Sequence, residues 1–160
     1  MYRIGQSIDI HQLVPGRDLV LGGVHIENDL GLLGHSDADV LLHAIIESII
    51  GALGLGDIGK HFSDQDPQYK GISSLVLLEH CYRLMDENGY EISNLDSIII
   101  IEKPKMAPHI DRMRSNVAKY LHCELNAVNI KATRGEKMGF VGHGEGAVAQ
   151  AVVLLKRKDK

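Results

Sequence analysis

Apolar and polar positions alternate along several short segments of the chain, which is the pattern of strands with one buried face. Residues 2–13 place apolar side chains between polar ones and predict a strand on which Asp9 and His11 share one side. Two apolar pieces around a Gly-Gly pair predict a hairpin or bent strand over residues 18–26. Further strands are expected at residues 95–102, 128–132 and 147–156. Four consecutive isoleucines, residues 98–101, predict burial of that strand on both faces.

Three other segments carry the pattern of helices. Ser36 and Asp39 have the spacing of a capping box, so we expect a helix that begins at Ser36 and ends at the Gly-Leu-Gly of residues 54–56. Two more helices are expected at residues 73–88, followed by Gly89, and at residues 108–121. The polar, turn-rich residues 57–67 are long enough to be a functional loop. Because helices alternate with strands, the pattern predicts a sheet covered by helices.

Composition narrows the possible partners. A chain of 160 residues with 44% apolar content predicts one domain, residues 1–160, with a substantial core. The net charge of −4 argues against nucleic acid as a partner, so an anionic substrate has to be held by metals and a few local cations. No segment has the pattern of a membrane span or a signal peptide. Cys81 and Cys123 lie outside any C-x-x-C pair and are expected to be reduced thiols of a cytosolic protein.

Asp9, His11 and His43 are candidate metal ligands. A carboxylate and an imidazole two positions apart on a strand point to one place, and a third donor from a helix would complete the three-ligand shell of an open zinc site. Two other interpretations stay open. A D-x-H triplet more often marks a surface strand with two polar side chains. His43, which is flanked by apolar residues, needs either a hydrogen-bond partner or a ligand.

Three further segments suit phosphate or nucleotide contact. Residues 103–108 form a proline-stiffened turn with backbone groups free for a planar ligand, or simply a rigid connection. Residues 131–137 bring together a hydroxyl, a guanidinium, a glycine and a carboxylate that could hold a diphosphate and its cation, or form a solvated charged loop. The glycine-rich residues 140–146 allow close backbone approach, or an ordinary turn.

Taken together, these segments resemble the 2-C-methyl-D-erythritol 2,4-cyclodiphosphate synthase family of the non-mevalonate isoprenoid pathway, and the resemblance covers the whole chain. The motifs that carry it are Asp9-Ile10-His11, Gly34-His35-Ser36-Asp37 with His43, Gly56-Asp57-Ile58-Gly59-Lys60, Phe62 with Asp64 and Asp66, Pro104-Lys105-Met106, Lys131-Ala132-Thr133 with Glu136-Lys137, and Gly142-His143-Gly144-Glu145-Gly146. A match to all of these ordered motifs by chance is far less probable than a chance match to one.

The resemblance implies an α+β fold, an α/β sandwich in which a mixed sheet is covered on one face by about three helices. It implies a homotrimer whose sheets face the trimer axis and whose active sites lie between subunits. It also implies a cytoplasmic protein, or a plastid protein in a photosynthetic eukaryote, although the sequence carries no transit peptide.

The implied reaction is intramolecular. In 4-diphosphocytidyl-2-C-methyl-D-erythritol 2-phosphate, the 2-phosphate attacks the β-phosphorus of the diphosphate, and CMP leaves. By resemblance, Asp9, His11 and His43 bind Zn²⁺, and Glu136 helps to hold Mg²⁺ or Mn²⁺ at the diphosphate. His35 and Arg134 are then the catalytic candidates that stabilise the developing charge.

The resemblance also implies a set of substrate-binding residues. Ser36 would contact phosphate together with His35; Asp57, Ile58 and Gly59 would contact the methylerythritol hydroxyls; and Ile101, Glu102, Lys103, Pro104, Lys105, Met106 and Ala107 would receive the cytosine. The remaining implied substrate-binding residues are Phe62, Ser63, Asp64, Gln65, Asp66, Thr133, Gly135, Phe140 and His143.

Several residues depart from the family pattern, among them Gln6 and Ser7 before Asp9. Arg134-Gly135 follows Thr133 where a second Thr is usual, His143 replaces an Arg that faces a cavity on the trimer axis, and Ile101 replaces a smaller residue. Two other functions use the same residues: a zinc phosphoesterase with zinc-bound water as nucleophile, and a non-catalytic protein that binds cytidine nucleotides or isoprenoid diphosphates.

Overall fold

The computed structural model describes residues 1–159, in which a curled five-stranded sheet forms one layer. The strand order is β4-β1-β7-β5-β6. The β5–β6 pair is parallel and the other neighbours are antiparallel, so the sheet is mixed as expected. The strands are β1 (Tyr2–Pro15), β4 (Leu30–Leu32), β5 (Tyr90–Ile100), β6 (Val128–Thr133) and β7 (Gly146–Arg157), and a separate hairpin consists of β2 (Leu19–Leu21) and β3 (Val24–Ile26).

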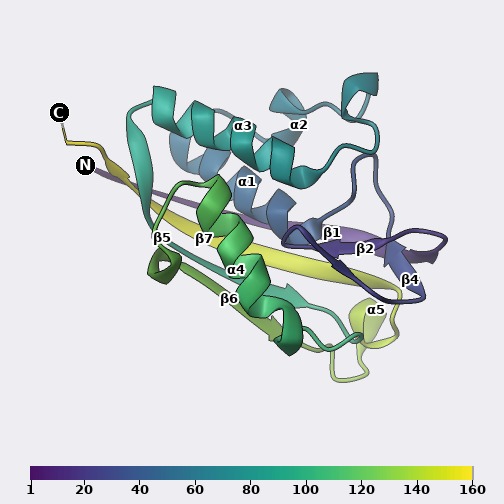
Figure 1. Ribbon diagram of the computed structural model, residues 1–160. Helices are drawn as coiled ribbons and strands as arrows, with labels where there is room; N and C mark the ends of the chain where they lie inside the picture. The colour runs from purple at the N-terminus through teal and green to yellow at the C-terminus, as the bar shows by residue number, and fades with distance from the viewer. Residues whose placement is uncertain (160) are drawn as a thin grey trace.

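The three longer helices lie on one face of the sheet (Figure 1), which confirms the predicted α+β class. They are α1 (Val40–Leu53), α3 (Ser74–Glu87) and α4 (Ile110–Tyr120). Helix α1 packs on β1 and β7, α4 packs on β6, and α3 covers α1. Short helical pieces fill the connections: α2 (Ile58–His61), α5 (Gly139–Gly142), η1 (Pro67–Tyr69), η2 (Ala107–His109) and η3 (Leu125–Ala127). No helix within residues 1–159 combines the length and the apolar character that a membrane crossing needs.

Helix α1 begins later than the capping-box spacing predicted. Its N-cap is Asp39, and Ser36 lies in the preceding turn. The carboxylate of Asp39 is fully buried and accepts three backbone hydrogen bonds, from Leu42 in the helix and from Gly22 and Gly23 in the β2–β3 hairpin. Burial raises the pKa of Asp39 to about 6, the nearby Asp37 carboxylate adds to the rise, and the three amides oppose it. Asp39 therefore caps α1 and anchors the hairpin to it.

Strand β1 turns its polar side inward. Gly5, Ser7, Asp9 and His11 face α1, and the helix approaches so closely that a Cβ on Gly5 would stand 1.9 Å from the Ser48 carbonyl oxygen. Only glycine allows this approach of strand to helix. The close packing brings the polar side chains of β1 against those of α1.

The opposite face of the sheet is apolar and open in the single chain. Ile4, Ile8, Ile10 and Val152 are between 46% and 71% exposed. Ile98 and Ile100 are also only half-buried, so the expectation that residues 98–101 are buried on both faces is wrong for one chain. Helices cover one side of β5, and within residues 1–159 nothing packs over the other side.

The two cysteines are free thiols. Cys81 is buried between α3 and α1, and burial raises its pKa to about 12, so the thiol stays protonated and unreactive at neutral pH. Burial, and then the Glu124 carboxylate, raise the pKa of the half-buried Cys123.

Candidate functional site

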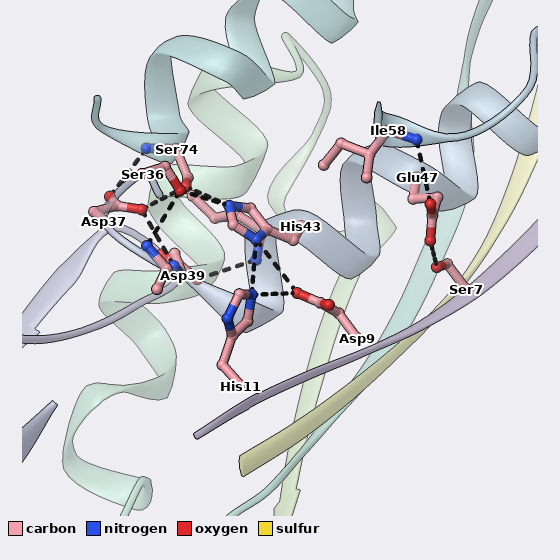
Figure 2. A network of polar contacts seen from close by, with 12 residues as sticks. Ser7, Asp9, His11, Ser36, Asp37, Asp39, His43, Glu47, Ile58 and Ser74 are labelled. Carbon is pink, nitrogen blue, oxygen red and sulfur yellow. Dashed lines mark hydrogen bonds and ion pairs between the residues drawn. The ribbon is translucent and has the colours of Figure 1, made fainter. Parts of the chain in front are cut away.

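Asp9, His11 and His43 converge where β1 meets the first turn of α1, as Figure 2 shows. Asp9 Oδ2 lies 2.9 Å from His11 Nε2 and 3.3 Å from His43 Nδ1. The two ring nitrogens are 3.2 Å apart. The predicted grouping of these three residues is therefore present, with one oxygen and two nitrogens at the corners of a small triangle.

Hydrogen bonds on the far side of each ring determine which nitrogen carries the proton. The Leu33 carbonyl, 2.8 Å from His11 Nδ1, can only accept, so Nδ1–H donates and Nε2 presents a lone pair to the site. His43 Nε2 lies 2.9 Å from Ser74 Oγ and 3.1 Å from Ser36 Oγ. The Ser74 hydroxyl donates to the Asp37 carboxylate, so it accepts from His43 Nε2–H, and Nδ1 presents a lone pair as well.

The triangle fits a divalent cation. In this arrangement three acceptors face one point, and Asp9 Oδ2 is buried with no hydrogen-bond donor within residues 1–159. Donors bound at about 2.0–2.1 Å to a tetrahedral ion lie roughly 3.3 Å apart, close to the three spacings found. Two imidazoles and a carboxylate also suit zinc, which keeps such three-ligand sites open at a fourth position.

Protonation of the rings competes with a cation for the same carboxylate. Burial alone would raise the pKa of Asp9, but the N–H groups and positive charge that His11 and His43 gain when their rings are protonated bring it well below its usual range. Burial alone would lower the pKa of His11, but the contact with Asp9 raises it. A cation at the triangle displaces that proton, so metal affinity rises with pH.

Ser74→Ala is expected to weaken metal binding about 10- to 100-fold, because His43 Nε2 loses the nearer of its two hydroxyl partners, the one that Asp37 holds as an acceptor. Competition with a chromophoric zinc chelator measures the change. Ser115→Ala removes a helix serine whose hydroxyl contacts only a backbone carbonyl at the surface, and it serves as the matched control. Equal zinc affinity in the two variants would contradict the assigned role.

A cavity of about 410 Å³ opens beside the triangle. Six of the predicted site residues line it together with the three ligands: His35, Ser36, Ile58, Gly59, Phe62 and Asp64. The cavity also contacts Gly34, Tyr69 and Leu77, which were not among the predicted site residues. Gly34 belongs to the Gly34-His35-Ser36-Asp37 motif, so the sequence could have indicated it. A Cβ on Gly34 would lie 3.1 Å from the His11 ring. Tyr69 and Leu77 carry no pattern that separates them from packing residues.

Four predicted residues of the same loop support the cavity from outside. Asp57 caps α2 by accepting from the Lys60 amide, and Ser63 accepts from the Gln65 amide. Asp66 caps η1. The Asp66 carbonyl lies 3.0 Å from His35 Nε2, so Nε2–H donates to it and the other ring nitrogen is left for a ligand.

The remaining predicted residues form a second group at the ends of β5 and β6. These strands are parallel, so the loops that follow them leave the same edge of the sheet, and the Gly135 amide donates to Glu102 Oε2 at 2.9 Å. Residues 133–137 also pack backbone to backbone on α5, since a Cβ on Gly142 would lie 2.4 Å from the Lys137 carbonyl carbon. Glu136 is held at a φ of +52°. The members of this group are Ile101, Glu102, Lys103, Pro104, Lys105, Met106, Ala107, Thr133, Arg134, Gly135, Glu136, Phe140 and His143.

One chain does not bring the two groups together. Ile10 pairs with Val148, Val148 with Ile100, and Ile100 with Thr133, so Thr133 lies three strand spacings, roughly 14 Å, from β1. Within residues 1–159, no member of the second group lines the 410 Å³ cavity. Most of them, including Thr133, Arg134, Glu136 and His143, are exposed. The predicted site is thus split into a metal half and a loop half.

A larger cavity of about 500 Å³ lies behind the turn at residues 34–39 and contacts Arg17, Asp18 and His25. Ser36 borders both cavities. We place the candidate site at the smaller cavity because the converging donor atoms line it.

Known proteins resemble the chain over nearly its whole length. A profile described as the YgbB family matches residues 2–156. A 2-C-methyl-D-erythritol 2,4-cyclodiphosphate synthase from Geobacillus sp. (strain WCH70) is 58% identical over 158 residues, which is 99% of this chain and 100% of the relative. The match therefore includes both halves of the split site.

Solved structures share the fold. The bifunctional IspDF from Campylobacter jejuni superposes with a TM-score of 0.95 at 38% identity; the match covers 99% of this chain and 43% of that protein, so the chain spans less than half of its length. IspF from Plasmodium falciparum, solved as a CDP complex, superposes with a TM-score of 0.87 at 32% identity and covers 99% of this chain and 97% of that one.

Proposed function

The chain belongs to the YgbB family, and from that membership we propose how the two halves of its site share one reaction. The protein catalyses the cyclisation of 4-diphosphocytidyl-2-C-methyl-D-erythritol 2-phosphate to 2-C-methyl-D-erythritol 2,4-cyclodiphosphate, with release of CMP. Relatives at 53% to 58% identity carry the name of this cyclising lyase. The relatives therefore favour the cyclase over the two alternative functions, a zinc phosphoesterase and a non-catalytic binding protein.

The chemistry of the substrate sets what the site has to do. A phosphate is already ionised near neutral pH, so the attacking group needs no strong general base. The main barrier is the approach of two anions at one phosphorus, in line with the departing CMP. Residues that fix the substrate and offset its charge therefore matter more than residues that move protons.

We propose that Asp9, His11 and His43 hold zinc and that Glu136 helps to hold magnesium or manganese. The convergence of three unprotonated donor atoms at the cavity wall carries the first assignment. When bound, the two cations polarise the diphosphate and offset the repulsion between the phosphate groups.

The chain's own groups orient the substrate around that point. His35 is fixed by the Asp66 carbonyl, and in its imidazolium form the second ring N–H donates to phosphate. Ser36 lies on the same wall, and Ile58 and Gly59 present backbone to the methylerythritol part across the cavity. Arg134, in the loop half, is exposed and free to add positive charge as the leaving group departs.

We propose further that a homotrimer completes the site by placing the loop half of one chain against the metal half of its neighbour. Two observations support this arrangement. The halves are roughly 14 Å apart within one chain. The outer face of the sheet exposes Ile4, Ile8 and Ile10 in a row that an isolated chain leaves in water. Residues 101–107 of the neighbour would then receive the cytosine. Cytoplasmic location stays a prediction.

Mixing two inactive variants tests the shared site. His43→Asn disables the metal half, and Glu136→Asn disables the loop half with a residue that tolerates the positive φ. We expect each variant alone to be inactive. Co-expressed at equal amounts with different tags, they should recover about a quarter of wild-type CMP release, because about a quarter of the sites combine two intact halves.

Product analysis belongs to the same experiment. Phosphorus NMR should show the cyclic diphosphate, without oxygen from labelled water. A mixed population as inactive as either parent would overturn the placement of the site between chains. An uncyclised 2,4-bisphosphate carrying solvent oxygen would overturn the cyclisation itself and favour zinc-assisted hydrolysis.

A further inference from the structure

Glu47 is the charged residue of an otherwise apolar helix. Helix α1 runs from Val40 to Leu53, eleven of its residues are buried, and Glu47 is its single ionisable residue besides His43. A carboxylate at such a place is unfavourable unless it has hydrogen-bond partners. Within residues 1–159, Glu47 forms no ion pair with a Lys or Arg. Its partners are therefore uncharged, and their positions indicate its role.

Two hydrogen bonds tie Glu47 to separate elements. The Ser7 hydroxyl on β1 donates to Glu47 Oε2, and the Ile58 amide at the start of α2 donates to Oε1 at 3.2 Å. Figure 2 shows the carboxylate between these two groups, one helical turn beyond His43. Ser7 lies two residues before Asp9 on the same face of β1, and Glu47 lies four residues after His43 on the same face of α1. The Asp9–His43 contact and the Ser7–Glu47 contact are therefore neighbours along the interface between β1 and α1.

The segment that Glu47 holds has little stability of its own. Helix α2 has four residues, and none of them is buried. A helix this short is unstable unless its ends are fixed from outside. The Lys60 amide donates a hydrogen bond to Asp57, and the Ile58 amide donates one to Glu47. The Ile58 amide is in the first turn, so α2 itself has no acceptor for it.

Helix α2 also contributes to the wall of the cavity that contains the metal ligands. Ile58 and Gly59 line the cavity with Asp9, His11 and His43, whereas Glu47 does not reach it. One carboxylate thus connects the metal-bearing strand and helix to the α2 part of the cavity wall.

We propose that Glu47 is a positioning residue for the substrate: by holding the Ile58 amide, it places the α2 backbone at the distance from the metal ligands that the methylerythritol phosphate requires. This inference rests on the proposed substrate site. Glu47 touches neither the cavity nor the metal ligands, so its removal should impair substrate binding and leave metal binding intact.

The test compares Glu47→Ala with Glu47→Gln in the zinc-loaded protein. The alanine variant should raise KM about tenfold with a smaller change in kcat and an unchanged zinc-to-chain ratio, because the wall of the cavity loosens while the ligands stay. Glutamine keeps an oxygen for the Ile58 amide and an NH₂ for Ser7, so it should restore KM to within about threefold of wild type. Glu79→Ala, which removes a half-exposed glutamate from α3, is the matched control and should behave as wild type.

Amide exchange gives a readout that does not depend on turnover. Exchange across residues 58–61, followed by mass spectrometry, should become several-fold faster in Glu47→Ala and stay slow in Glu47→Gln. An unchanged KM in Glu47→Ala, a loss of zinc that parallels the loss of activity, or a glutamine variant as impaired as alanine would each overturn the proposal. Absence of cyclic product from the wild-type protein would overturn the proposed function instead, and the exchange rates would still decide the role of Glu47.

Discussion

His43→Asn is expected to remove stoichiometric zinc from the folded protein and to lower turnover roughly a thousandfold or more. His43 supplies the only donor to the triangle from α1, and its ring lies 3.3 Å from Asp9 Oδ2 and 3.2 Å from His11 Nε2. Asparagine offers a shorter, weaker donor that cannot reproduce this geometry. Elemental analysis gives the zinc content, and CMP release gives the activity.

His122→Asn is the matched control for that substitution. His122 lies at the surface against Tyr82 and adopts a φ of +51°, a conformation that asparagine tolerates. It should retain zinc and activity. If His43→Asn kept near-stoichiometric zinc and near-normal CMP release, the Asp9, His11 and His43 site would be wrong.

Asp39→Ala is expected to lower the free energy of unfolding by about 3 kcal/mol or more. Alanine leaves the amides of Gly22, Gly23 and Leu42 without their acceptor, and each buried, unpaired donor is unfavourable by about 1–3 kcal/mol. The free energy of unfolding of Asp39→Asn should lie between those of wild type and Asp39→Ala. Asparagine keeps the oxygen that accepts from the Gly22 and Leu42 amides, and only the Gly23 amide meets an NH₂ group. Urea denaturation followed by circular dichroism measures all three proteins.

The N-cap of α3 provides the comparison. Ser73 is exposed, and its hydroxyl accepts one backbone hydrogen bond at 3.3 Å, so Ser73→Ala should cost about 1 kcal/mol or less. If Asp39→Ala were no more destabilising than Ser73→Ala, Asp39 would be an ordinary helix cap and not the anchor of the hairpin.

Local pattern was enough to predict most elements and the metal half of the site. The D-x-H spacing on a strand determines that Asp9 and His11 share a face, and the apolar run around His43 marks a helix that packs on that face. The Ser36–Asp39 spacing predicts a helix that begins at Ser36, because it satisfies the local pattern of a capping box. Asp39 is the cap because it also anchors the hairpin at Gly22 and Gly23, a tertiary requirement that spacing does not contain.

Features that depend on partners distant in sequence were missed. Strand β4 has three residues and exists because β1 pairs with it, so its own sequence carries little strand signal. The isoleucines at 98–101 were predicted to be covered on both faces, but a single chain covers one. The family resemblance named residues 101–107 and 133–136 as site residues, but it could not show that they lie across the sheet from His11.

The pairing of β1 with β7 determines how late in synthesis of the chain the metal site can form. All three ligands lie within the first 43 residues, yet Asp9 and His11 are aligned opposite Ala149 and Ala147, near the end of the chain. A nascent chain that lacks only its last strand carries every ligand but lacks the β7 pairing that aligns Asp9 and His11. Metal binding at this site is therefore expected late in folding, and removal of the last strand should abolish it without touching a ligand.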